Sequence, residues 1–336
     1  MTAGPPGAPG PDRARRVLVL GGTGFVGRTV CADFRTAGWD VLAVARTAPE
    51  RPVAARFLPL DLAETPPDDL ARTLEAERPD VVVNATGSIW SRDDAAMDRI
   101  CTVPTLRLLD ALGALRNRPR PLPRLVHLGS VLEHGPVPPP DGTPRPGDTP
   151  GPGPAPEPTT PYGKAKLVAS RAVLEAAANG AVRALVLRVA NVSGVGAPDV
   201  SLLGRVARRL VEGAARGEPV TVELAPLRAH RDYVDVRDVS AAVLAAALSS
   251  ASGRAVDIGR GEAVPVRRLV DLLVRVSGVP ARIVERPEDP GAVPERDWIR
   301  TDLAPARELL GWRPTRGLDE SLAAYWEDVS GRAATV

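Results

Sequence analysis

Short, wholly apolar runs alternate with segments of helical periodicity along most of this chain. Continuous apolar runs of this length are typical of parallel strands whose sheet is covered on both faces. Strands are predicted at residues 17–20, 41–45, 57–62, 81–87 and 125–130, and helices at 29–37, 95–112 and 167–178. The alternation predicts an α/β fold, a doubly wound parallel sheet.

Between the first strand and the first helix, glycines recur every third residue, at Gly21, Gly24 and Gly27. A strand, a glycine-rich turn and a helix in this order can bind a dinucleotide pyrophosphate. The helix N-terminus offers free N–H groups, and glycine lets the backbone approach the phosphates. We therefore expect a Rossmann fold in which this turn, with Phe25 and Val26, contacts the cofactor.

The end of the second strand selects between the two nicotinamide dinucleotides. A carboxylate there binds the ribose 2′-hydroxyl of NAD, whereas arginine accommodates the 2′-phosphate of NADP. The chain reads Ala45-Arg46, with Arg51 nearby and no acid before Glu50, which predicts NADPH bound by Arg46. Further cofactor contacts are expected at the ends of the next strands, from Asp61, Leu62, Ala85, Thr86 and Gly87.

Composition narrows the class of protein. The formal charge of the 336 residues is only +2 and aromatic residues are few, which argues against a nucleic-acid surface. No apolar segment is long enough to cross a bilayer, and two cysteines are too few for a disulfide framework or a metal cluster. We expect a soluble, cytoplasmic protein without a metal, preceded by a disordered tail at residues 1–14.

A proline-rich segment at 136–161 lies between the fifth strand and the third helix. Twelve of its 26 residues are proline, so it can form neither a helix nor an interior strand. We interpret it as a loop over the active site; the alternative is an inert surface insertion.

Tyr162 and Lys166 follow this segment, four residues apart and hence on one face of a helix. Lys164 and Lys166 are the only lysines among 43 basic residues, which indicates that a retained lysine has a role that arginine cannot fill. An ammonium near a phenol lowers the pKa of the phenol by favouring phenolate. Tyr162 can then give a proton to a carbonyl oxygen that receives a hydride from nicotinamide, while Ser130 hydrogen-bonds the same oxygen.

The glycine turn, Asn84-Ala85, Ser130, Tyr162 and Lys166 together resemble the extended short-chain dehydrogenase/reductases. That branch contains nucleotide-sugar epimerases, dehydratases and reductases, and the resemblance implies that Lys166 also holds the nicotinamide ribose. The likeness spans about residues 15–325 and implies a homodimer formed through helices such as 167–178. Further segments match in order: Arg188–Gly194, Arg231–Asp238, Ile258-Gly259, Arg286-Pro287 and 301–312.

Three places depart from the family pattern. Cys101 stands where an often structural asparagine is usual, and His134 replaces a tyrosine, as a packing substitute in our interpretation. Val131-Leu132 follow Ser130 where sugar dehydratases carry Asp-Glu and decarboxylases carry a glutamate. Because two aliphatic side chains cannot act as acid or base, lyase chemistry is disfavoured.

Beyond Asn191 the segments are expected to interleave. Residues 15–194 and 231–261 should build the dinucleotide-binding domain, and residues 195–230 and 262–330 a smaller substrate domain. The two candidate arginines would grip a diphosphate through their planar guanidinium groups. Substrate contacts are predicted from Ser88, Trp90, Ser130, Asn191, Arg231 and Arg286.

The resemblance and the residues together predict an NADPH-dependent reductase of a 4-keto-6-deoxyhexose carried on a nucleoside diphosphate, with dTDP as the first choice. An epimerase that uses tightly held NAD is the first alternative. A ketoreductase of a non-sugar natural product follows if the arginines are only solvated surface charges. A catalytically silent, nucleotide-sensing protein is a fourth possibility, against which the intact Ser130, Tyr162 and Lys166 argue.

Overall fold

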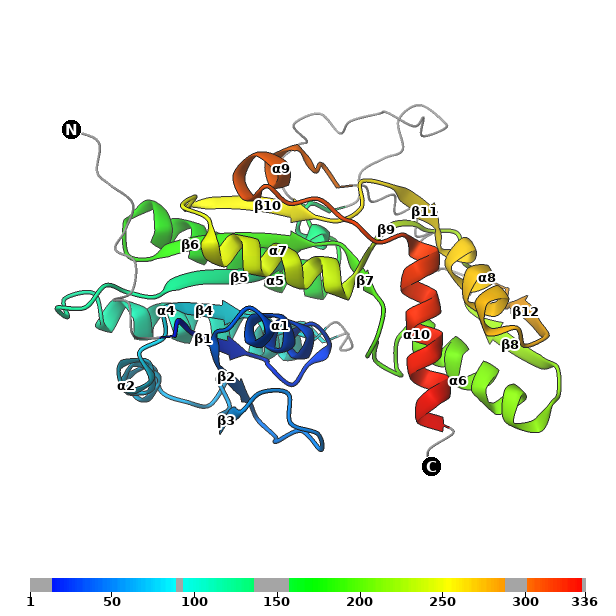
Figure 1. Ribbon diagram of the computed structural model, residues 1–336. Helices are drawn as coiled ribbons and strands as arrows, with labels where there is room; N and C mark the ends of the chain where they lie inside the picture. The colour runs from blue at the N-terminus through cyan, green and yellow to red at the C-terminus, as the bar shows by residue number, and fades with distance from the viewer. Residues whose placement is uncertain (1–13, 89–92, 136–156, 288–300, 334–336) are drawn as a thin grey trace.

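A sheet of seven parallel strands forms the larger part of the protein (Figure 1). The computed structural model describes residues 14–88, 93–135, 157–287 and 301–333. The strand order is β10-β6-β5-β4-β1-β2-β3, so the chain reverses its direction of travel between β1 and β4. The prediction of a doubly wound parallel sheet is confirmed. The strands are β1 (Arg16–Leu20), β2 (Asp40–Ala45), β3 (Arg56–Pro59), β4 (Val81–Asn84), β5 (Arg124–Ser130), β6 (Arg183–Val189) and β10 (Arg254–Ile258).

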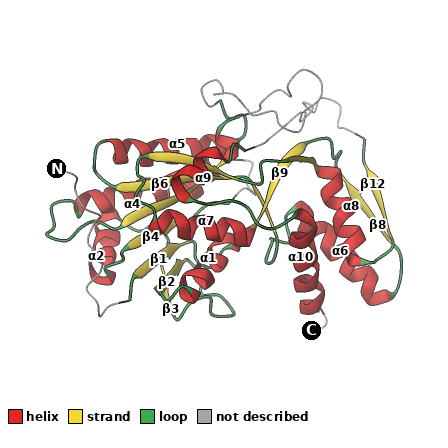
Figure 2. Ribbon diagram, turned by 45° about the horizontal axis from the view of Figure 1, so that its top comes forward, coloured by secondary structure: helices red, strands yellow, loops and turns green. Residues whose placement is uncertain are grey.

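Helices cover both faces of this sheet (Figure 2). On one face lie α1 (Phe25–Thr36) and α7 (Val236–Leu248); on the other lie α2 (Pro67–Glu77), α4 (Val103–Ala114) and α5 (Pro161–Ala178). Successive residues of β5 point to opposite faces, since Val126 packs toward α1 and α7 whereas Leu125 packs toward α2 and α4. The inner strands β1, β4 and β5 are therefore buried on both sides, as their apolar sequences predict, whereas β3 at the edge of the sheet is only half-buried.

Several elements end or begin at other residues than predicted, each for a local reason. Helix α1 begins at Phe25 instead of Thr29, because Gly24 already has the extended backbone of an N-cap. Strand β4 ends at Asn84, whose side-chain oxygen accepts the N–H of Thr86 and turns the chain. Strand β3 ends at Pro59, and Asp61 then accepts the N–H of Ala63 in a turn.

The helix expected at 95–112 contains a wider turn near its start. It comprises α3 (Asp94–Met97), the π-helical turn η1 (Asp98–Thr102) and α4, and the N–H of Val103 bonds to the carbonyl of Asp98, five residues back. Pro104 follows at once, and proline cannot supply the N–H of an ordinary helical bond. The π-turn accommodates this proline without ending the helix.

A second core lies beyond the carboxyl ends of the strands (Figure 1). It contains α6 (Leu202–Arg216), β8 (Val220–Leu224), α8 (Val266–Ser277), β12 (Ala281–Glu285) and α10 (Leu318–Ala333), with β8 and β12 paired in parallel. Between the two cores, β7 (Asn191–Ser193), β9 (His230–Asp235) and β11 (Ala263–Pro265) form a three-stranded sheet. Of residues 231–260, β10 joins the large sheet and α7 covers one of its faces, whereas β9 belongs to the three-stranded sheet.

The segment Arg231–Asp238 holds distant parts of the chain together through buried aspartates. Asp232 accepts the N–H groups of Arg260, Gly261 and Thr301, at 2.7–3.2 Å. Asp238 accepts the N–H groups of Thr315 and Arg316 at 3.0 and 2.9 Å, and pairs with the Arg316 guanidinium at 2.7 Å. This segment anchors the C-terminal third of the described chain to the start of α7.

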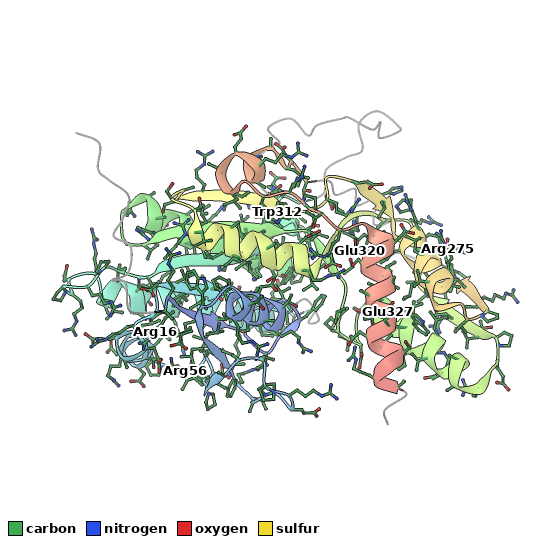
Figure 3. The ribbon with its side chains drawn as sticks, viewed as in Figure 1. Arg16, Arg56, Arg275, Trp312, Glu320 and Glu327 are labelled. Atoms are coloured by element: carbon green, nitrogen blue, oxygen red, sulfur yellow. The ribbon has the colours of Figure 1, made fainter. Side chains whose placement is uncertain are left out.

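Trp312, labelled in Figure 3, reinforces the same junction, because its Nε1 donates to the carbonyl oxygen of Asp238 at 3.0 Å. It lies between α9 (Ala304–Leu310), which packs near β10, and α10. None of the described helices is both long and apolar enough to cross a membrane.

We expect Asp238→Ala to lower the free energy of unfolding by about 2 to 3 kcal/mol, because it leaves the Thr315 and Arg316 donors without a buried acceptor. Asp271→Ala is a matched control, since it removes an exposed aspartate–arginine pair on α8 and should cost less than about 1 kcal/mol. Urea unfolding of both variants measures the difference. Equal losses would contradict the anchoring role of Asp238.

Candidate active site

A cavity of about 700 Å³ opens between the carboxyl ends of the strands and the second core. It lies at the point where the strand order reverses, which is where parallel α/β sheets bind ligands. The sheet side contributes the glycine turn, the ends of β4 and β5, and α5; the other side contributes α6, α8 and the segments next to β8. The lining includes residues 24–27, 85–88, 128–130, Tyr162, Lys166, 189–192, 201–203, 225–227, Arg231 and Leu269.

The glycine turn has the features that an anionic cofactor needs. No side chain caps the N-terminus of α1 and no acid lies in its first turn, so its first N–H groups are left for an anion. Gly21 has φ +76°, and a Cβ there would lie 2.7 Å from the carbonyl oxygen of Ala85. A Cβ on Gly27 would lie 2.1 Å from the carbonyl oxygen of Gly21, so only glycine lets the helix pack this close to the turn. These residues fit a dinucleotide pyrophosphate.

The other predicted cofactor residues divide into two groups. Ala85, Thr86 and Gly87 line the cavity, as do Phe25 and Val26. Arg46, Asp61 and Leu62 do not line it; they follow the paired strands β2 and β3 and lie together at that edge of the sheet. The Arg46 side chain is exposed there, whereas Leu62 is buried.

Lys166 is buried on α5, and its ammonium is held by two main-chain carbonyls. Nζ donates to the oxygens of Thr86 and Leu128 at 2.9 and 2.8 Å, and lies 6.0 Å from the centre of the Tyr162 ring. Lys164 is exposed. The two lysines thus point to different sides of the helix, as their spacing predicts.

The pKa of Tyr162 differs in direction from the sequence-based expectation. Burial raises the pKa of this phenol above its ordinary value, and the neighbouring Cys101 and Glu133 raise it further, while a hydrogen bond with Ser130 lowers it. Burial also lowers the pKa of Lys166. The Lys166 ammonium donates to the carbonyl oxygens of Thr86 and Leu128 and does not stabilise a Tyr162 phenolate. The phenol is therefore protonated at neutral pH. That is the state in which it can give a proton to a carbonyl.

Asn84 holds the turn that presents the Thr86 carbonyl to Lys166. Its Oδ1 accepts the N–H of Thr86 at 3.2 Å and the hydroxyl of Thr86 at 2.6 Å. Its Nδ2 donates to Thr105 at 3.1 Å and lies 3.2 Å from Nδ1 of His127. Burial and the charge of Lys166 lower the pKa of His127 well below its usual value, so the ring is neutral and Nδ1 accepts. Sequence reasoning missed both Thr105 and His127.

Glu133 is a third residue that sequence reasoning missed. It ends the short 3-10 helix η2 (Val131–Glu133), and its side chain is fully buried. Oε1 accepts the N–H of Ser130 and the hydroxyl of Ser170, both at 2.8 Å, and Oε2 pairs with Nε of Arg188 at 2.9 Å. The Ser-x-x-Glu spacing of Ser130 and Glu133 is that of a capping box, a signal present in the sequence.

The predicted substrate residues are only partly brought together. Ser88, Ser130, Asn191 and the nearly buried Arg231 line the cavity. Arg286 does not; its guanidinium is exposed and pairs with Glu223 on β8 at 2.7 Å, so its assignment to the substrate is not supported. Trp90, residues 1–13 and residues 136–156 of the proline-rich segment lie outside the described residues.

Two further positions change the picture of the cavity wall. Arg205 on α6 was not predicted, yet it lines the cavity. Leu132 lines it as well, whereas Val131 is buried in the sheet core. His134 pairs with Asp257 on β10 at 3.1 Å and does not line the cavity, which agrees with a structural role.

Comparison with known proteins places these features in a family. The model of the NAD-dependent epimerase/dehydratase family matches residues 17–259. The chain is 42% identical over 311 residues to a dTDP-6-deoxy-L-talose 4-dehydrogenase (NAD(P)(+)) from Kitasatospora kifunensis, covering 93% of this chain and 94% of that protein. It is 28% identical to a GDP-6-deoxy-D-mannose reductase from Pseudomonas aeruginosa, covering 95% and 98%.

A solved structure gives the same result. That of RMD from Pseudomonas aeruginosa complexed with NADPH matches with a TM-score of 0.76 at 27% identity, covering 95% of this chain and 98% of that one.

The two lysines allow a matched test of the site. We expect Lys166→Arg to lower kcat with a ketone substrate and a nicotinamide cofactor by about a hundredfold, because the wider guanidinium cannot make the same two carbonyl contacts in a buried position. Lys164→Arg changes an exposed side chain and should leave kcat within about threefold. Steady-state kinetics of both variants decide; similar losses at the two positions would remove the special role of Lys166.

Proposed function

The chain belongs to the NAD-dependent epimerase/dehydratase family, and from that premise we propose that it reduces the 4-keto group of a nucleoside-diphosphate 4-keto-6-deoxyhexose with NADPH. It is an NAD(P)-dependent enzyme of the extended short-chain dehydrogenase/reductase type. The observation that carries the proposal is the meeting of a protonated phenol, a hydroxyl and a buried ammonium at one cavity, with the glycine turn beside them.

Each of the three side chains has a separate task in this reaction. A bound nicotinamide dinucleotide supplies the hydride when it is reduced and accepts one when it is oxidised. Tyr162 gives its proton to the carbonyl oxygen, which otherwise would become an alkoxide. Ser130 donates a hydrogen bond to the same oxygen and orients it. Lys166 fixes the face of α5 on which Tyr162 lies, and would hold the nicotinamide ribose.

The relatives support a reaction at C4 of a 6-deoxy sugar. A 4-dehydrogenase oxidises a 4-hydroxyl, which is the reverse of reducing a 4-keto group, so the same residues serve both directions. The 6-deoxymannose reductase points to the same class of substrate with another nucleotide. Of the candidate nucleotides, we favour dTDP because the relative named for it is 42% identical. The aliphatic Val131 and Leu132 provide no acid or base for a dehydration.

An epimerase remains the second candidate, because a UDP-glucose 4-epimerase from Azospirillum brasilense is 27% identical over 325 residues. The residue that follows β2 favours the reductase. Arg46 stands where NAD-dependent enzymes have a carboxylate, and the next acid along the chain is Glu50. A non-sugar substrate is disfavoured by the two arginines that line the cavity, Arg205 and Arg231. Guanidinium groups suit a diphosphate better than an uncharged polyketide.

We further propose that the smaller core holds the nucleotide part of the substrate, because Arg205 on α6 lines the cavity.

We also propose that the enzyme is a homodimer. Two large apolar side chains are exposed on neighbouring helices, Leu106 on α4 and Val168 on α5, at 39% and 50%. Isolated exposed apolar residues are common, but two on one pair of helices fit the helix-mediated contact expected from the sequence.

The cofactor proposal rests on Arg46. NADPH should bind at least about tenfold more tightly than NADH, because the 2′-phosphate gains a charge-assisted contact with the guanidinium. Arg46→Asp should reverse the preference, and Arg35→Asp, at an exposed position in the last turn of α1, should not. Fluorescence titration with both dinucleotides measures the affinities. Equal affinities in the unmutated protein would refute NADP selectivity and favour the epimerase.

Cofactor stoichiometry tests the reaction. Protein given a dTDP-4-keto-6-deoxyhexose should consume one NADPH for each hydroxyl formed, because the hydride stays in the product. Given dTDP-glucose, it should form no 4-keto-6-deoxy product. Absorbance at the wavelength of the reduced nicotinamide, with chromatography of the sugar, follows both. Conversion of a sugar without net loss of NADPH would identify an epimerase.

A further inference from the structure

A buried carboxylate lies behind the candidate catalytic residues and outside the cavity lining, at Glu133. We propose that Glu133 is a positioning residue, whose carboxylate holds the strand that carries Ser130 and the helix that carries Tyr162 in one fixed register. The inference rests on the proposed function for the roles of Ser130 and Tyr162. It assigns to Glu133, Ser170 and Arg188 a role of their own.

The first argument is the spacing along α5. Tyr162, Lys166 and Ser170 follow one another at intervals of four, so they form a single stripe on one face of the helix. Lys166 is tied to the ends of β4 and β5, and Ser170 is tied to Glu133. A rotation or a slide of α5 that moved Tyr162 away from Ser130 would also break the hydrogen bond of Ser170.

The second argument is that one oxygen serves both elements. Oε1 of Glu133 accepts the N–H of Ser130 and the hydroxyl of Ser170, each at 2.8 Å. The first bond fixes the backbone that aims the Ser130 hydroxyl; the second fixes the helix. Because both donors meet at one atom, the distance between strand and helix is set at this point.

The surroundings are shaped for this carboxylate. A Cβ on Gly129 would lie 2.5 Å from Oε1 of Glu133 and 2.9 Å from the hydroxyl of Ser170. Only glycine at this position of the strand therefore leaves room for the carboxylate and the hydroxyl. Gly129 is the register partner of Arg188 on β6, and Arg188 reaches the other oxygen of Glu133 at 2.9 Å. A buried carboxylate needs such a partner, since burial without one is costly.

The ion pair also acts on the phenol. The charge of Glu133 raises the pKa of Tyr162 and that of Lys166. The other charged or titratable groups at this phenol are Cys101 from η1 and Lys166 from α5, while Arg188 on β6 balances Glu133. Removing the carboxylate while Arg188 remains should lower the pKa of Tyr162, whereas removing a carboxylate whose charge does not reach the phenol would leave that pKa unchanged.

The chain offers a direct readout, because it has three tyrosines, Tyr162, Tyr233 and Tyr325. Protein labelled with carbon-13 at the tyrosine ring carbon that bears the hydroxyl gives three signals, and Tyr162→Phe assigns one of them. In Glu133→Gln, the Tyr162 signal should move to its phenolate position at a lower pH than in the unmutated protein. Glu175→Gln, the same change at an exposed position on α5, should leave the titration unchanged.

Kinetics supply the second readout. We expect Ser170→Ala, which removes the clamp but no charge, to lower kcat for the keto sugar by about tenfold or more with little change in KM, because misplaced groups slow chemistry more than binding. Native kcat in this variant would overturn the clamp, as would a titration of Tyr162 that is unaltered in Glu133→Gln. If Glu133→Gln fails to fold because Arg188 is left unpaired, Glu133→Gln combined with Arg188→Met removes both charges and still tests the effect on kcat.

The two proposals fail in different ways. If the unmutated protein reduces no keto sugar but the Tyr162 signal shifts in Glu133→Gln, the reaction is wrong and the action of Glu133 on the phenol stands. If turnover is present while neither the titration in Glu133→Gln nor kcat in Ser170→Ala changes, the reaction stands and the role of Glu133 is wrong.

Discussion

The burial of one ammonium sets the arrangement of this site. Lys166 is 2% exposed, and a cation in such a place is stable only if its protons have acceptors. It takes main-chain oxygens from the ends of two neighbouring strands, β4 and β5, and thereby fixes α5 against the carboxyl edge of the sheet. Gly87 completes the contact, since its φ of +137° belongs to glycine and a Cβ there would lie 3.0 Å from Nζ. The phenol one turn earlier is placed by these same contacts.

The wall of the cavity opposite the sheet is held in place by buried carboxylates, whereas the sheet side is held by the Lys166 ammonium. Asp232 and Asp238 each satisfy several main-chain N–H groups from segments at least 28 residues away in sequence. Asp235 caps the N-terminus of α7 between them. The side of the cavity that faces the glycine turn is thus joined to the sheet by a short run of residues, two of which, Arg231 and Tyr233, line the cavity wall.

Much of this could be read from the sequence, because its strands are apolar on both faces and its glycines sit where strand meets helix. Tyr162 and Lys166 were found by their spacing, and the two lysines by their rarity. Glu133 and His127 were not found, because an acid or a histidine in a sequence does not show whether it is buried or what it meets across the sheet. The assignment of Arg286 to the substrate is not supported by the structure, for a related reason. The sequence has 41 arginines and does not show that Arg286 pairs with Glu223, which lies 63 residues away on another strand. The direction of the Tyr162 pKa was wrong since burial outweighs a cation that is already bonded elsewhere.

The π-turn at Asp98–Thr102 makes the phase of a helix depend on a single residue. An α-helix advances about 100° for each residue, so one extra residue in a wider turn rotates everything before it relative to everything after it. Met97 and Cys101 both face the buried group that contains Ala165, next to the phenol. Deleting one residue from this turn would change this phase by about 100° and turn Met97 away from α5. Homologues that differ in length by one residue here should therefore present different side chains to the same catalytic helix.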